Sequence, residues 1–239
     1  MPRKLFRGLR GVLTTMNHGS FLIKDNFFSP EEMEPIRQLC LQLDKQKSNV
    51  HEAGRYKDLQ WHKVDLVAEE HPFLGKIYDF LGAKRDGLCV FYYLSPGAML
   101  HPHRDLTGAS SNARIRFHVP VITNDNVFFE VSRKRVRMLP GQLWSLDTSY
   151  LHSVENRSDQ TRVHIVIECD IDEKVVRHLP PKTLASRVHD AHFFLILGTA
   201  FAKAMAINSW KNPRYFVNQL RMIAKFVGWR FLGQSRKDI

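Results

Sequence analysis

Cysteine is scarce in this chain of 239 residues, which contains three of them, Cys40, Cys89 and Cys169. They form no CxxC pair and lie far apart in the sequence. A sparse, odd number of cysteines argues against a disulfide framework and is typical of a reducing compartment. We therefore expect each cysteine to be a small, buried apolar residue.

Long apolar segments are also missing from the sequence. No run reaches the roughly 18 apolar residues that a membrane-spanning helix needs. The longest candidate, residues 191–202, is shorter and contains His192. The basic N-terminus is followed by no apolar run of signal-peptide length. We therefore expect no secretion signal, no clear membrane span and a cytoplasmic location.

Acidic residues are scarce at both ends of the chain, which has a net charge of +11. Residues 1–12 carry a charge of +4 and residues 182–239 a charge of +8, which leaves −1 for residues 13–181. A nucleic-acid enzyme more often carries its basic charge around its site, so we expect no nucleic-acid partner. A neutral body with basic ends instead favours attachment to an anionic surface.

The hydrophobic pattern of the body predicts helices followed by strands. The segment Ser29-Pro30-Glu31-Glu32 offers a capping residue, a proline at the first helical position and a capping box, so it predicts a helix start. A second helix is expected over residues 72–81. Six short strands are expected after it, over residues 88–94, 114–121, 127–131, 136–139, 143–146 and 163–169. Because turns rather than helices separate them, we expect an α+β fold with a jelly-roll-like β-core over about 88–172.

Two consecutive prolines, Pro180 and Pro181, break the chain. We expect one domain over residues 1–181 and a basic, helical tail over residues 182–239. Apolar residues recur in this tail at helical spacing: Phe216, Leu220, Ile223, Val227 and Phe231. Such a helix either packs on the β-core or lies on an anionic membrane surface, and the basic and aromatic residues of the tail favour the second.

A pattern of metal-ligand type lies inside the expected β-core. His103 and Asp105 follow a strand, and residues two apart in an extended segment point to the same side. His152 follows another expected strand about fifty residues later. Two imidazoles and one carboxylate on one face leave three positions open, which is the facial triad of non-heme iron(II) oxygenases. The open positions are needed for a bidentate 2-oxo acid and dioxygen.

An HxD motif alone has a simpler reading, a loop histidine beside a turn aspartate. Here the motif has context that favours metal binding, because both histidines lie at strand ends. In addition, Arg162 follows His152 by ten residues on the next expected strand. A guanidinium at this place can hold the distal carboxylate of 2-oxoglutarate through two parallel hydrogen bonds.

These motifs together resemble the aspartyl/asparaginyl β-hydroxylase-like branch of the 2-oxoglutarate oxygenases. The resemblance covers roughly residues 88–172. It rests on the segments at 100–105, 114–121, 141–147, 151–153 and 161–165, which read LHPHRD, RIRFHVPV, GQLWSLD, LHS and TRVHI.

The resemblance implies a double-stranded β-helix fold of the jelly-roll or cupin kind. It assigns His103, Asp105 and His152 to iron, Arg162 to the 2-oxoglutarate carboxylate, and His118 to a place near that carboxylate. Some animal members lack the acidic ligand, whereas this sequence keeps it, so a three-ligand iron site is expected. Two further arginines, Arg104 and Arg116, are candidates for contact with a substrate anion, and a solvated side chain is the alternative for Arg104.

The expected activity is therefore hydroxylation of an unactivated C–H bond with iron(II), 2-oxoglutarate and O2. The basic tail favours an acidic, membrane-linked substrate and a peripheral position on the inner face of a bacterial inner membrane. Within the group that the sequence resembles, this points to hydroxylases of the Kdo sugar of the lipid A inner core. The enzymatic alternative is a hydroxylase of a free amino acid such as proline. The non-enzymatic alternative is a cupin-like metal-binding module.

Overall fold

A computed structural model of the chain describes residues 19–45, 60–105, 114–211, 214, 217 and 220–221. Backbone contacts divide the chain into two compact units, residues 1–187 and residues 188–239. The sequence suggested a boundary a few residues earlier, after Pro181. The first unit holds the sheets and the candidate site, and the second holds most of one long helix.

Two helices of the first unit begin where their sequences predict, and the second also ends there. In α2, Pro30–Lys45, the backbone N–H of Ser29 donates to the Glu32 carboxylate over 2.8 Å, and the N–H of Glu32 donates to the Ser29 hydroxyl over 3.3 Å. These two bonds form the expected capping box. The second helix, α3 (Pro72–Leu81), ends at Gly82, whose φ of 63° suits a residue without a side chain.

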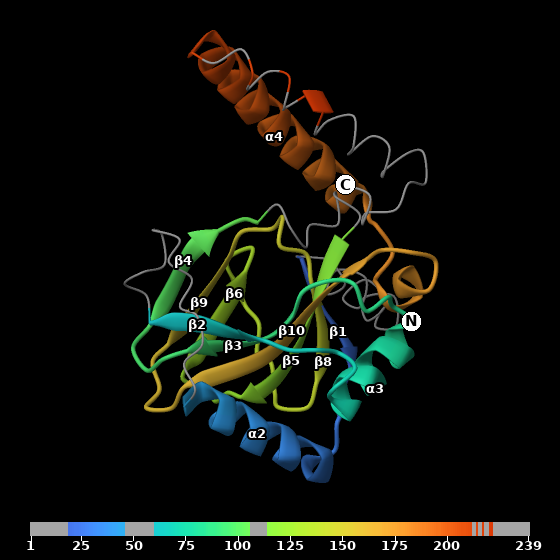
Figure 1. Ribbon diagram of the computed structural model, residues 1–239, viewed down its shortest axis with the longest axis vertical. Helices are drawn as coiled ribbons and strands as arrows, with labels where there is room; N and C mark the ends of the chain where they lie inside the picture. The colour runs from blue at the N-terminus through green and yellow to red at the C-terminus, as the bar shows by residue number, and fades with distance from the viewer. Residues whose placement is uncertain are drawn as a thin grey trace, which may run out of the picture. The chain divides into compact units, whose positions relative to one another are not determined.

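The strands form two antiparallel sheets, which confirms the expected α+β fold with a jelly-roll core (Figure 1). The larger sheet has the order β1-β8-β5-β10-β3-β2, and the smaller has the order β4-β9-β6-β7. The strands of the larger sheet are β1 (Ser20–Lys24), β2 (Trp61–Asp65), β3 (Cys89–Leu94), β5 (Arg114–Ile122), β8 (Leu143–Leu146) and β10 (Arg162–Asp170). Those of the smaller sheet are β4 (Met99–His103), β6 (Val127–Val131), β7 (Lys134–Arg135) and β9 (His152–Asn156).

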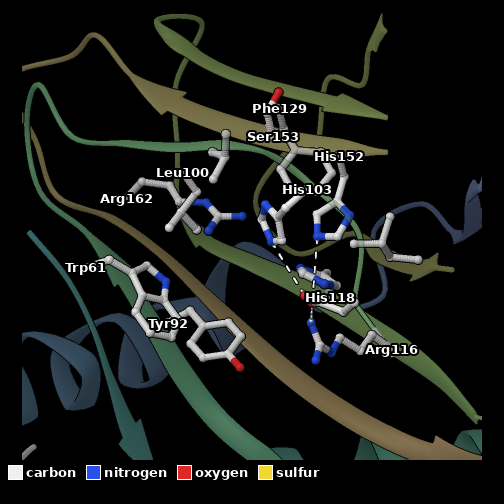
Figure 2. A pocket seen from close by; sticks show the side chains of 13 residues that line it. Trp61, Tyr92, Leu100, His103, Arg116, His118, Phe129, His152, Ser153 and Arg162 are labelled. Atoms are coloured by element: carbon white, nitrogen blue, oxygen red, sulfur yellow. Dashed lines mark hydrogen bonds and ion pairs between the residues drawn. The ribbon is translucent and has the colours of Figure 1, made fainter. Parts of the chain in front are cut away.

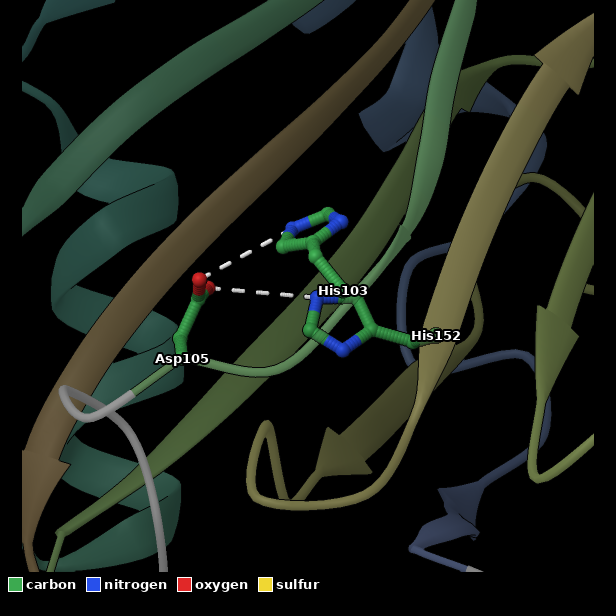
Figure 3. Close-up of side chains that lie close together, drawn as sticks. All are labelled: His103, Asp105 and His152. Atoms are coloured by element: carbon green, nitrogen blue, oxygen red, sulfur yellow. Dashed lines mark ion pairs between the residues drawn. The ribbon is translucent and has the colours of Figure 1, made fainter. Parts of the chain in front are cut away.

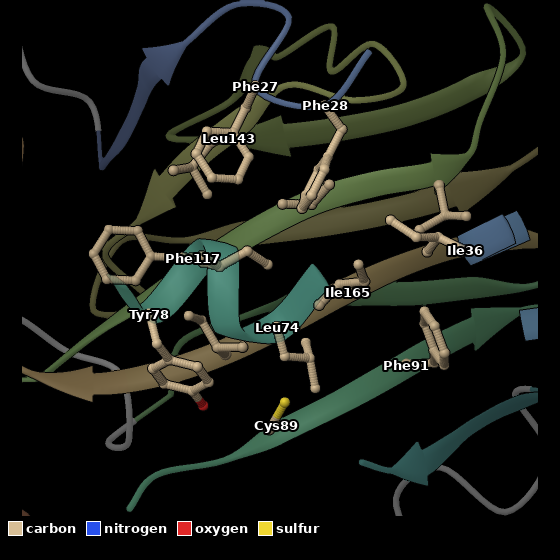
Figure 4. Close-up of a cluster of buried hydrophobic side chains, with 14 of the residues drawn as sticks. Phe27, Phe28, Ile36, Leu74, Tyr78, Cys89, Phe91, Phe117, Leu143 and Ile165 are labelled. Atoms are coloured by element: carbon tan, nitrogen blue, oxygen red, sulfur yellow. The ribbon is translucent and has the colours of Figure 1, made fainter. Parts of the chain in front are cut away.

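Alternation along β5 and β10 separates most of the main core from the interior between the sheets. The odd-numbered side chains, among them Phe117 and Ile165, pack against α2 and α3 together with residues such as Ile36 and Leu74 (Figure 4). The even-numbered side chains face the other way. They include the polar residues Arg114, Arg116, His118, Arg162, His164 and Glu168. A second apolar cluster, which includes Leu94, Phe129 and Val154, joins the two sheets.

One expected strand is placed wrongly by the sequence pattern. Residues 136–139 form no strand; the strand after β6 is β7, over Lys134–Arg135. Ser132 and Arg133 both adopt positive φ values, 53° and 63°, so the turn is tight and pairing resumes directly after it. One further bond to β6 follows, from the Val136 N–H to the Phe129 carbonyl over 2.8 Å, and the N–H of Leu139 donates to the Gln142 side chain instead of a strand.

The 28-residue helix α4, Leu184–Lys211, revises the expectation about apolar segments. Within the described residues, its stretch Leu184–Asn208 is long and apolar enough to cross a membrane, judged by length and composition only. Isolated polar residues such as Asp190 and Lys203 interrupt its apolar runs, which is why no continuous run of sufficient length appears in the sequence. The apolar stripe expected between residues 216 and 231 falls largely outside the described residues.

Candidate metal centre

The pairing of β4 with β9 brings two of the three candidate ligands together. His103 and His152 are direct partners in this antiparallel pair, and their ring centroids lie 4.3 Å apart. Asp105 lies two residues beyond the end of β4, where its backbone N–H donates to the carbonyl of Thr148 over 2.9 Å. Figure 3 shows the three side chains converging on one another.

Backbone carbonyls orient both imidazole rings. The Nδ1 atom of His103 lies 2.6 Å from the carbonyl oxygen of His101, and that of His152 lies 3.0 Å from the carbonyl oxygen of Tyr150. Since a carbonyl only accepts, each Nδ1 carries the proton, and each Nε2 is left with its lone pair. Both Nε2 atoms face the Asp105 carboxylate, at 3.7 Å for His103 and 3.9 Å for His152.

The donor set and its protonation suit a divalent metal. The ligand atoms of His103, Asp105 and His152 all lie within 4.8 Å of one another. Burial, assisted by the neighbouring His103, lowers the pKa of His152 to about 4, so its imidazole is neutral near pH 7 and able to donate its lone pair. Two imidazoles and one carboxylate with open positions are the ligands that non-heme iron(II) takes in oxygenases.

A cavity of about 280 Å³ contains this triad. Trp61 and Tyr92 stand beside each other on one wall, with ring centroids 5.0 Å apart (Figure 2). The cavity is otherwise lined by Leu100, Arg116, His118, Phe129, Leu146, Ser153, Val154 and Arg162. The lining of the cavity is therefore largely apolar. It includes two arginines, Arg116 and Arg162, which have different partners.

Arg162 is a buried cation without a carboxylate partner among the described residues. Its side chain contacts the Nδ1 atom of His164 at 2.8 Å, and its Nε has no hydrogen-bond partner. Burial lowers the pKa of Arg162 to about 9, so the guanidinium is still charged at neutral pH. A buried charge with no counterion is costly. This arrangement fits a carboxylate-bearing ligand such as 2-oxoglutarate.

His118 also has unused hydrogen-bonding capacity. Both of its ring nitrogens are buried and lack a hydrogen-bond partner. Burial first, and the nearby charge of Arg162 second, hold the pKa of His118 well below its usual range. The ring is therefore neutral, and one nitrogen can donate to a ligand carboxylate that enters the cavity.

The two candidate substrate arginines are both engaged within the protein. Arg104 donates to the carbonyl of Ser149. Arg116 donates from Nη1 to Oδ2 of Asp105 over 2.6 Å and from Nε to Oε2 of Glu168 over 3.1 Å. A role for either arginine in binding a substrate anion remains a prediction.

Sequence reasoning did not single out several residues of this site. His164 and Glu168 lie on the inner face of β10, and the alternation that starts at Arg162 was the available signal for both. Alternation along β3 was likewise the available signal for Tyr92, which lines the cavity. Trp61 gave no signal, because its place beside the cavity depends on the pairing of β2 with β3.

Comparison with known proteins agrees with the fold and identifies a family. Residues 31–171 match the family described as Aspartyl/Asparaginyl beta-hydroxylase. No curated protein matches the chain. A prolyl hydroxylase from Trichoplax adhaerens, solved with a hypoxia inducible factor fragment, is 14% identical over 75% of this chain and 98% of its own, with a TM-score of 0.51.

Two further solved structures are similar at lower TM-scores. A Pseudomonas putida prolyl-4-hydroxylase is 16% identical over 67% of this chain and 95% of its own, with a TM-score of 0.46. EctD from S. alaskensis, solved with 2-oxoglutarate and 5-hydroxyectoine, is 12% identical over 67% of this chain and 75% of its own, with a TM-score of 0.49.

The jelly-roll fold and the His-Asp-His cluster define the class of 2-oxoglutarate-dependent oxygenases. Within this class, the chain belongs to the aspartyl/asparaginyl beta-hydroxylase family, which matches it over more than half of its length. The protein is therefore a 2-oxoglutarate-dependent hydroxylase, whose cofactors are iron(II), 2-oxoglutarate and O2. The alternative of a non-enzymatic cupin-like module is set aside.

Proposed function

We propose that the protein hydroxylates an unactivated C–H bond, with His103, Asp105 and His152 holding iron(II). Arg162 binds the C5 carboxylate of 2-oxoglutarate, and His118 lies beside that carboxylate. The observation that carries this assignment is the buried, uncompensated guanidinium of Arg162 in the same cavity as the three ligands. Neither the triad nor the buried arginine alone requires a 2-oxo acid. Together they place a metal site and an anion-binding site in one cavity.

Iron(II) held by the triad would, together with 2-oxoglutarate and O2, supply the oxidant, and the protein supplies position and shelter. Arg162 and His118 fix the distal end of the cosubstrate. The Nδ1 contacts of the two histidines hold their Nε2 atoms towards the metal position. The apolar wall, which includes Phe129 and Val154, keeps water away from the reacting centre.

For the substrate, we propose an acidic sugar linked to a membrane lipid, the Kdo residue of the lipid A inner core. The support is the charge of +8 on residues 182–239 together with the long apolar helix α4. Inside the cavity, Arg162 serves the cosubstrate and Arg116 is paired with Asp105 and Glu168. The acid groups of such a sugar would therefore meet basic residues outside these two. A free amino acid such as proline is the second candidate.

The test compares these acceptors directly. Purified protein is incubated with iron(II), 2-oxoglutarate, ascorbate and either Kdo-containing lipid A or free proline, and products are analysed by mass spectrometry. We expect the lipid-linked sugar to gain one oxygen atom, with matching succinate. His152→Ala removes a ligand and should abolish both signals, whereas His71→Ala, outside the cavity, should keep them. Oxygen gain on proline alone would overturn the sugar assignment but not the hydroxylase.

The proposed location is the cytoplasmic face of an anionic membrane. Basic residues of the tail, among them Arg214 and Arg221, would be attracted to anionic lipid by roughly 1 kcal/mol each near the surface. Helix α4 would add apolar contact. Such attachment would bring the iron site close to a lipid-linked substrate.

A further inference from the structure

A chain of alternating charges runs from the candidate metal ligand Asp105 along the inner face of the larger sheet. Arg116 binds Asp105 at one end of its guanidinium and Glu168 at the other, over 2.6 and 3.1 Å. Glu168 accepts a second contact from Arg114 over 3.3 Å. Arg114 in turn reaches Asp170 over 3.2 Å. The register of β5 and β10 pairs Arg116 directly with Glu168 and Arg114 with Asp170.

Burial makes Glu168 the most constrained member of this chain. Its side chain is 4% exposed, compared with 25% for Asp105 and 29% for Asp170. A buried carboxylate is tolerated when cations satisfy both of its oxygens. Here each oxygen of Glu168 has its own arginine. Glu168 therefore holds the Nε atom of Arg116, while Nη1 of the same guanidinium contacts Asp105.

We propose that Glu168 is a positioning residue for the metal centre and acts on Asp105 through Arg116. Held by Glu168, the guanidinium engages Oδ2 of Asp105, while Oδ1 lies towards Nε2 of His103. The carboxylate is thereby restrained in rotation and presented to the metal in one orientation. Glu168 also shares the charge of Arg116, which would otherwise act on Asp105 alone and compete with a cation for it.

This inference rests on the proposed iron-binding role of Asp105, and it changes the expected role of Arg116. The sequence suggested that Arg116 reaches a substrate anion. In the structure both ends of its guanidinium bind carboxylates of the protein, those of Asp105 and Glu168. These contacts fit a role in positioning the metal ligand Asp105 better than a role in binding substrate. Partners that orient a metal ligand typically change metal affinity by about 10–100-fold when they are removed.

The experiment measures Mn2+ binding to the whole, metal-free protein by isothermal titration calorimetry. Glu168→Gln keeps the shape of the side chain but removes its charge. We expect the dissociation constant for Mn2+ to rise by tenfold or more. Asp170→Asn is the matched control, because it lies two residues further along the same strand and, among the described ion pairs, is bound by Arg114 rather than by Arg116. We expect its effect to be less than twofold.

A second variant guards against loss of the fold. Arg116→Lys keeps the positive charge, but an ammonium lacks the fork that reaches both carboxylates. It should weaken Mn2+ binding as Glu168→Gln does, with circular dichroism unchanged. An equal loss of affinity in Asp170→Asn, or unchanged affinity in Glu168→Gln, overturns the positioning role. If the unmodified protein itself fails to bind Mn2+, the metal assignment fails instead, which separates the two proposals.

Discussion

At the scale of single residues, Arg162 carries the most specific chemistry of the site. It is 3% exposed and pairs with no carboxylate among the described residues. We expect Arg162→Lys to lower the apparent affinity for 2-oxoglutarate at least tenfold, or about 1.4 kcal/mol, because lysine lacks the planar fork that binds a carboxylate at two points. Succinate formation as a function of 2-oxoglutarate concentration measures this affinity.

The same variant should leave the metal site intact. Mn2+ affinity measured without 2-oxoglutarate is the control, and it should stay within about twofold of the unmodified protein, since Arg162 contacts none of the three ligands in the described contacts. An unchanged dependence on 2-oxoglutarate would contradict the assignment of Arg162.

Buried histidines predict how stability depends on pH. Burial holds the pKa values of His118 and His164 well below the usual range, so both are neutral in the folded protein. In the unfolded chain they take up protons below about pH 6.5. The unfolded state then binds more protons, so the free energy of unfolding is highest above that pH and falls as the pH drops through it. Each histidine contributes at most about 1.4 kcal/mol per pH unit.

Urea denaturation of the metal-free protein between pH 7.5 and 5 measures this slope. Replacing one of the two buried histidines, as in His164→Gln, should reduce the slope, because one group no longer titrates on unfolding. A slope identical to that of the unmodified protein would mean that His164 is already protonated in the fold.

At the scale of elements, the alternating pattern of β5 and β10 explains what the sequence predicts well. Apolar residues at odd positions, such as Phe117 and Ile165, form the core face. Their two-residue period can be recognised from the sequence alone. The even positions between them include Arg116, His118 and Arg162, so the polar face of these strands can also be recognised from the sequence. Arg162 was singled out for this reason, whereas His103, Asp105 and His152 were singled out by their HxD…H spacing.

Pairing between distant strands explains what the sequence does not predict. Strands β1, β2, β4 and β9 were not recognised, because short segments such as Met99–His103 contain proline and histidine rather than an alternating apolar pattern. The position of Trp61 on the cavity wall depends on the register between β2 and β3. The contact of Arg116 with both Asp105 and Glu168 likewise depends on three segments meeting, and no local pattern encodes it.

Helix α4 gives a prediction of its own. Large apolar side chains such as Leu195 and Ile196 are exposed, at 66% and 47%, and the helix is long enough to cross a bilayer. We expect the full chain to sediment with vesicles that contain anionic lipid. The double substitution Leu195→Glu and Ile196→Glu should abolish sedimentation, because charged groups are costly in the apolar layer. Lys203→Gln, on the same helix, is the matched control and should still sediment.

Salt separates two modes of attachment by this helix. A helix inserted across the bilayer stays with the vesicles at high ionic strength. A helix held at the surface by basic residues is released as salt screens their charges. Full-length protein that ignores anionic vesicles at low salt would exclude both modes, and a free amino acid would then become the better substrate candidate.

At the scale of the whole molecule, the family defines the reaction, and the support for the proposed substrate comes from α4 and the basic tail. The cavity of about 280 Å³ is lined largely by apolar and aromatic side chains apart from its ligands and arginines. Apolar and aromatic side chains of this kind can pack against the C–H-rich face of either proposed substrate, a sugar or a cyclic amino acid. The choice between them therefore depends on α4 and the basic tail, which is why the acceptor comparison and the vesicle experiment should be read together.

The direct pairing of His103 with His152 has a consequence for the mobility of the smaller sheet. The ladder between β4 and β9 is irregular between Leu100 and His103, so main-chain bonds alone tether the end of β4 weakly. A metal bound by both histidines would act as a cross-link at this end. Amide hydrogens of β4 and β9 should then exchange with deuterium more slowly in Mn2+-loaded protein than in chelator-treated protein. Amides of β3, which carries none of the three ligands, should exchange at the same rate in both forms.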